Sequence, residues 1–88
     1  MSPTAAATQT HFTPAAFSEC LLEAVAADRR RDARDRAQHA LLLRPFVGSD
    51  AEPSIFEATM AEHCRRNADL ADVARQILAL WRVCSDRH

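Results

Sequence analysis

The sequence predicts an all-α protein, and three observations support this fold class. The chain contains a single glycine, Gly48, and no tyrosine, whereas hairpin turns need glycine and strands favour aromatic residues. Eighteen of its 88 residues are alanine and all eleven basic residues are arginine, and both types are strong helix formers. Apolar residues recur at helical spacing along most of the chain. We therefore expect a purely helical protein, with an alanine and arginine bias typical of a GC-rich bacterial genome.

The size and composition of the chain limit its class. With 88 residues and a mass of 9.8 kDa, the chain has room for one small domain, which we expect over residues 13–88. Apolar residues make up 48% and charged residues 26%, as in ordinary globular proteins. This length excludes a large multilayered catalytic fold. No window approaches the roughly 20 apolar residues that a membrane span needs, so we expect no membrane contact.

The first helix has a clear start signal. Residues 1–12 are rich in Ser, Pro, Thr and Ala without apolar periodicity, which predicts a flexible N-terminal tail. Thr13 can cap the free N–H groups of a first turn, and Pro14 at the first helical position loses no hydrogen bond. Phe12, just before the cap, can fold back onto the new helix as a hydrophobic staple.

The first helix is expected to run over residues 14–43. Its apolar stripe fades in the charged run 28–36, which offers only Ala33 for burial. Either one long helix crosses this run in solvent, or the helix kinks near residues 27–32. The absence of glycine and proline from the run favours the continuous helix. Pro45 ends it, because the residue before a proline is pushed out of the α region.

A loop over residues 44–53 and a second helix over residues 54–85 complete the chain. The loop contains two prolines and the only glycine. Ser54 and Glu57 have the spacing of a capping box, in which each side chain accepts from a free N–H of the first turn. Residues further on follow the 3-4-3-4 spacing of a helix–helix seam. Polar residues leave open a break of this helix near residues 67–69.

A helical hairpin or three-helix arrangement has too few layers to enclose a core by itself. We therefore expect the chain to complete a bundle by self-association or by docking on a protein partner. Its expected function is that of a small non-enzymatic interaction protein: a homodimeric bundle, an adaptor, a chaperone-like partner or an accessory subunit. The amphipathic C-terminal helix would supply the binding stripe. The residues expected at this interface are Phe17, Leu21, Val25, Leu70, Val73, Ile77, Leu80, Trp81 and Cys84.

A run of arginines suggests an alternative function, a small nucleic-acid-binding regulator. Arginine-rich helices can follow phosphates, and guanidinium groups stack on bases. Asp28, Asp32 and Asp35 are interleaved with the arginines at i,i+3 and i,i+4 spacing, which favours a self-neutralising face in solvent or against a protein. The candidate polyanion contacts are Arg29, Arg30, Arg31, Arg34 and Arg36.

Metal binding and catalysis have weaker support. His63 and Cys64 could surround a Zn²⁺ ion together with Cys84 and His88, but this spacing matches no zinc-finger pattern. Both cysteines fall on apolar faces, where a free thiol behaves as a small hydrophobe. We therefore expect no metal ion and no cofactor. An accessory subunit of a redox or metal enzyme stays open as a third alternative.

Two Cys–His pairs, Cys20 with His39 and Cys64 with His63, are the only nucleophile–base combinations that the sequence suggests. Adjacent residues point to different helix faces, and no known catalytic motif occurs. We therefore expect no enzymatic activity from the chain alone. The three cysteines lack CxxC spacing, and the first 28 residues contain no basic residue of a secretory signal. These features predict a cytoplasmic protein with reduced thiols.

Overall fold

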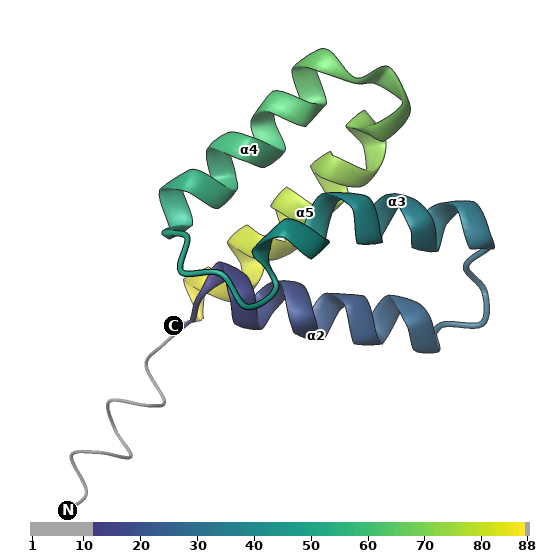
Figure 1. Ribbon diagram of the computed structural model, residues 1–88, viewed down its shortest axis with the longest axis horizontal. Coiled ribbons are helices and arrows are strands. Elements are labelled where there is room, and N and C mark those ends of the chain that lie inside the picture. The colour runs from purple at the N-terminus through teal and green to yellow at the C-terminus, as the bar shows by residue number, and fades with distance from the viewer. Residues whose placement is uncertain (1–11, 88) are drawn as a thin grey trace, which may run out of the picture.

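The computed structural model describes residues 12–87, which form four α-helices and one short 3₁₀ helix (Figure 1). No strand occurs in this part of the chain, which confirms the all-α prediction. The tail expected over residues 1–12 lies outside the described residues, apart from Phe12. The elements are α2 (Pro14–Ala27), α3 (Ala33–Leu43), η1 (Arg44–Phe46), α4 (Pro53–Arg66) and α5 (Ala68–Asp86).

Helix α2 begins as the sequence predicts. The Thr13 side chain accepts a hydrogen bond from the backbone N–H of Ala16 at 3.1 Å, and Pro14 occupies the first turn. Phe12 packs edge-on against Phe17, with ring centroids 5.9 Å apart. These two residues flank the cap at the positions of a hydrophobic staple. The staple holds Phe12 against the fold, so the predicted tail cannot extend to this residue.

The predicted continuous helix over residues 14–43 is wrong, because the chain turns between α2 and α3. Asp28 is extended, and its carboxylate accepts from the backbone N–H of Arg30 at 3.0 Å. Asp32 is also extended and caps α3 by accepting from the N–H of Asp35 at 2.8 Å. Aspartate side chains compete with the helix for backbone N–H groups, so two of them end one helix and start another without glycine or proline. Helix α3 then folds back against α2.

The connection from α3 to α4 lies in the predicted loop. Helix α3 ends at the expected boundary, Leu43, but the expected reason is wrong, because Arg44 before Pro45 keeps an α-region backbone and continues into a 3₁₀ turn. The following 3₁₀ turn carries Phe46 into the core, where its exposed fraction is 5%. Gly48 has a φ of +74°, a conformation that strains any residue with a Cβ. The only glycine of the chain therefore lies where the loop needs it.

The predicted capping box at the start of α4 is wrong. The helix begins with Pro53, so Ser54 already lies inside the first turn, and the N-cap residue, Glu52, makes no side-chain cap bond. Glu57 instead accepts a hydrogen bond from the indole Nε1 of Trp81 at 2.7 Å. Proline is preferred at the first helical position, so the helix begins at Pro53, one residue earlier than predicted. Ser54 and Glu57 have the spacing of a capping box, but the Glu57 carboxylate bonds to Trp81 of α5 instead of to the start of its own helix.

Substitutions of the two residues can distinguish these arrangements. Ser54→Ala should change the free energy of unfolding by less than about 0.5 kcal/mol, because Ser54 is an exposed residue without a capping role. Glu57→Ala should lower it by about 1–3 kcal/mol, because the buried indole N–H loses its acceptor. Urea titrations of both variants check this expectation. Equal losses of free energy of unfolding in the two variants would contradict this expectation and support the capping box.

The second break separates α4 from α5 at a single residue. Asn67 has an extended backbone, and its N–H still donates to the carbonyl oxygen of His63 at 3.1 Å. The break near residues 67–69 that the sequence left open therefore occurs. It lets α5 return along α4, and the α4–α5 pair is the most extensive helix contact of the fold. Gln38 of α3 donates to the carbonyl oxygen of Asp69, which ties α3 to the start of α5.

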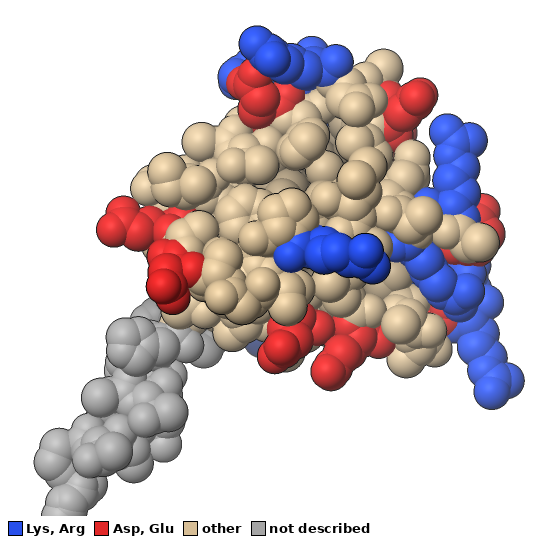
Figure 2. All heavy atoms as spheres, in the orientation of Figure 1, with Lys and Arg blue, Asp and Glu red and all other residues tan. Residues whose placement is uncertain are grey.

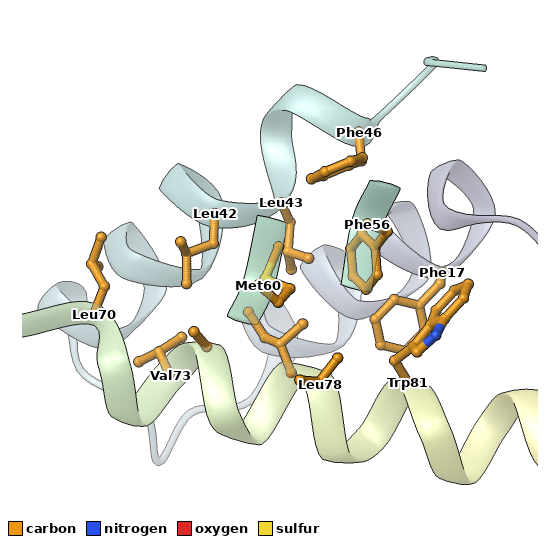
Figure 3. Close-up of a cluster of buried hydrophobic side chains, with 12 residues drawn as sticks. Phe17, Leu42, Leu43, Phe46, Phe56, Met60, Leu70, Val73, Leu78 and Trp81 are labelled. Carbon is orange, nitrogen blue, oxygen red and sulfur yellow. The ribbon is translucent and has the colours of Figure 1, made fainter. Parts of the chain in front are cut away.

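These two breaks give a single chain its own core (Figure 3). Trp81 lies among Phe12, Phe17 and Phe56, with ring centroids 4.7, 5.3 and 4.8 Å away. Figure 3 shows Trp81 beside Phe17 and Phe56. Phe46 packs edge-on against Phe56 from the other side. Four helices, in place of the expected two or three, enclose this cluster, so most of the apolar surface is covered within one chain. The other large buried side chains are Leu42, Leu43, Met60, Leu70, Val73, Ile77 and Leu78.

Candidate protein-binding groove

The structure divides the nine residues predicted at an interface into two groups. Six lie in the core of the chain, each at most 5% exposed: Phe17, Val25, Leu70, Val73, Ile77 and Trp81. Neighbouring helices cover these six side chains, so most of the predicted binding stripe along α5 is buried within the chain. The other three, Leu21, Leu80 and Cys84, stay at least partly exposed, and all three line one apolar depression.

This depression is an open groove of about 430 Å³ between α2 and the C-terminal half of α5. We call it the α2–α5 groove. Leu80, one of the few large apolar side chains with much exposure, is 41% exposed on the α5 side. None of the lining residues is charged. They are Phe12, Ala16, Phe17, Cys20, Leu21, Ala24, Leu80 and Cys84.

The packing of the helices explains why a groove forms here. Helix α2 packs on α3 and η1, whereas α5 packs on α4 and α3. The main connection from α2 to α5 is the aromatic contact of Phe12 and Phe17 with Trp81. Beyond it, the α2 wall consists of Leu21 and the small residues Ala16, Cys20 and Ala24. Small side chains at i,i+4 spacing make a low wall, which leaves the space between the helices open.

Sequence reasoning found residues on both sides of this groove. The predicted interface contains Phe17 and Leu21 on α2 and Leu80 and Cys84 on α5, but it leaves out Ala16, Cys20 and Ala24. These three residues repeat every fourth position next to Leu21, which was the available signal. The signal is weak, because alanine is common on every face of this chain.

The arginine run spans the turn between α2 and α3 and the first turn of α3. Several of its side chains belong to a compact ionic network. Arg31 bonds to the Asp35 carboxylate at 2.7 Å and lies 3.3 Å from that of Asp28. Arg36 donates to the backbone carbonyl of Asp28 at 2.9 Å. Arg30 also pairs with Asp28, although its side chain is 91% exposed. Acidic and basic side chains gather accordingly at the right edge of Figure 2, where this turn lies.

The network perturbs the acid–base properties of two of its members. The backbone N–H and then the side chain of Arg30 bond to Asp28 and hold the pKa of its carboxyl below the ordinary value. The hydrogen bond to Asp35 raises the pKa of Arg31. Of the five candidate polyanion contacts, Arg29 and Arg34 are exposed and make no ion pair with another residue in the described range.

The cysteine and histidine candidates are distributed over the fold. Cys20 is exposed in the α2–α5 groove, whereas His39 is buried with its Nδ1 atom 2.9 Å from the Asp35 carbonyl oxygen. The Cys64 thiol donates to the carbonyl oxygen of Ala71 at 3.8 Å. Among residues 12–87, no three His, Cys, Asp or Glu side chains form a group that could hold a metal ion. His88 lies outside the described residues.

Comparison with known proteins finds no match among family models, curated proteins or solved structures. Within residues 12–87, no helix combines the length and the apolar character that a membrane crossing requires.

Proposed function

We propose that this chain is a small non-enzymatic interaction protein that binds a helix of a polypeptide in the α2–α5 groove. The observation that carries the proposal is the groove itself, a depression of about 430 Å³ with uncharged, mainly apolar walls. Leu80 remains 41% exposed there, although Leu70, Val73 and Ile77 of the same helix are each at most 5% exposed. Exposed apolar surface in a depression is a common feature of protein-binding sites.

The spacing of the walls supports a helix as the ligand. The α2 wall presents Ala16, Cys20 and Ala24, and the α5 wall presents Leu80 and Cys84, in both cases at i,i+4 intervals. Rows of side chains at this interval form the ridges that pack into the grooves of another helix. Helix-in-groove recognition uses apolar anchors at i, i+3, i+4 and i+7. The proposal therefore keeps the expected pairing of the C-terminal helix with the first helix but restricts the C-terminal part to the last two turns of α5.

A designed peptide can test the proposal. The probe is a fluorescent, uncharged helix of about 14 residues, roughly 21 Å long, with leucine anchors at i, i+3, i+4 and i+7. Fluorescence anisotropy measures its affinity for the native chain. Leu80→Asp should weaken binding by about tenfold or more, because a carboxylate would have to lose water in an apolar groove.

Val83→Asp is the matched control. Val83 lies on the same helix and is 54% exposed, but it does not line the groove. This variant should bind the peptide like the native chain. A native chain that fails to bind the peptide, or two aspartate variants that bind equally, would overturn the proposed function.

A further inference from the structure

The α2 wall of the groove has an acidic rim. Helix α2 contains only two charged residues, Glu19 and Glu23, which follow the groove-lining residues Ala16 and Cys20 by three positions and so neighbour them on the helix surface. Both glutamates are exposed, and neither forms an ion pair with another described residue. Like charges one turn apart on a helix repel each other. A cation beside this rim would convert that repulsion into attraction.

A second exposed surface has the complementary composition. Arg34, Ala37, Leu41 and Arg44 follow a 3-4-3 spacing along α3 and into the first residue of η1, and we call them the α3 stripe. Leu41, at its centre, is 64% exposed and borders a shallow hollow of about 520 Å³. Neither arginine of the stripe forms an ion pair within residues 12–87.

The two surfaces belong to different helices, the groove to α2 and α5 and the stripe to α3. In Figure 2, acidic side chains project from the lower edge, along α2, whereas a basic side chain crosses the front over α3. Their lengths are similar, since a helical rise of about 1.5 Å per residue gives the stripe roughly 15 Å and the α2 wall from Ala16 to Ala24 roughly 12 Å. One chain therefore carries an acidic-rimmed apolar groove and, elsewhere, an apolar stripe with an arginine at each end.

We infer that the α2–α5 groove binds the α3 stripe of a second copy of this chain, so that copies associate head to tail. The inference rests on the proposed function and names its ligand. Leu41 of one copy enters the groove beside Leu80 of the other, and the stripe arginines approach Glu19 and Glu23. Contact between two grooves is disfavoured, because a two-fold interface uses the same patch on both copies and doubles the acidic charge there. A head-to-tail contact forms a ring or an open chain.

Two variants separate this arrangement from every symmetric one. Leu80→Asp damages the groove but leaves the stripe, and Leu41→Asp damages the stripe but leaves the groove. Light scattering should show a native mass that rises with concentration through dimers to larger species, whereas each variant alone stays monomeric. An equimolar mixture should form a heterodimer and nothing larger, because one intact groove and one intact stripe remain. Monomeric native protein, or variants that do not pair when mixed, would overturn the inference.

Charge reversal tests the electrostatic part of the contact. Arg34→Glu with Arg44→Glu should weaken association of the native chain by about tenfold or more. Glu19→Arg with Glu23→Arg in the other copy should restore it. All four side chains are exposed, and circular dichroism checks that the variants remain folded. Reversed pairs that associate no better than the single reversals would overturn the inference.

The peptide assay distinguishes failure of this inference from failure of the proposed function. The Leu41→Asp chain has an intact groove, so it should still bind the leucine-anchored peptide. Peptide binding that depends on Leu80, together with a monomeric native chain, would overturn the second copy as ligand and preserve the groove as a binding site. Loss of peptide binding in the native chain would overturn both.

Discussion

Ile77→Asp should unfold the protein, whereas Leu80→Asp should leave it folded. The two residues belong to the same predicted seam, but Ile77 is 1% exposed and Leu80 is 41% exposed. A carboxylate at Ile77 would be buried without a partner, which costs several kcal/mol. A domain of this size has a free energy of unfolding of only about 4–11 kcal/mol, so much of its stability would be lost.

Far-ultraviolet circular dichroism during urea titration measures this difference. The native chain and Leu80→Asp should unfold at similar urea concentrations, because the Leu80 side chain already borders solvent. Ile77→Asp should have little helical signal or a transition at much lower urea. An Ile77→Asp variant as stable as Leu80→Asp would contradict the assignment of Ile77 to the core.

Trp81→Ala should have an effect of comparable size. Trp81 is 1% exposed and contacts the rings of Phe12, Phe17 and Phe56, so it joins the start of α2 to α4 and α5. Removal of a buried tryptophan costs about 3–5 kcal/mol, because the cavity left behind is only partly filled. Urea titration should therefore show a large fall in the free energy of unfolding.

Trp81→Phe provides the graded control. Phenylalanine keeps an aromatic ring in the cluster but loses the Nε1–H group that donates to Glu57. We expect a smaller loss of about 1–3 kcal/mol, between the native chain and Trp81→Ala. A Trp81→Phe variant as unstable as Trp81→Ala would indicate that the hydrogen bond, and not the packing, carries the stability of this site.

The helix boundaries that sequence reasoning predicted correctly depend on local chemistry. Thr13 and Pro14 start α2, and Pro45 follows the end of α3, because capping and the restricted backbone of proline act within one turn. The break at Asp28 and Asp32 is local too. The sequence left it open as a kink near residues 27–32. The continuous helix was favoured because only glycine and proline were considered as helix breakers, while aspartate side chains also bind the free N–H groups of a turn.

The α2–α5 groove could be predicted only in part. Helical spacing identified Leu80 and Cys84, and their exposure follows from the position of α2 beside α5. Phe17 and Leu21 of the α2 wall were predicted, but its small residues and the α3 stripe were left out, because alanine at i,i+4 spacing looks the same on a buried, an exposed and a binding face. Once the break at Asp28 is known, α3 becomes a separate helix with a free outer side, and the spacing of Arg34, Leu41 and Arg44 can be interpreted.

The sequence by itself determined that the chain is helical, where α2 begins and where α3 ends, since propensity, capping and proline act over a few neighbouring residues. Only the tertiary structure decided which apolar residues form the core and which stay exposed. Ile77 and Leu80 share one helix and one spacing, yet the first is covered by the folded-back helices and the second borders a gap. Burial depends on neighbours that are distant in the chain. Two short breaks, at Asp28 to Asp32 and at Asn67, decide which neighbours those are.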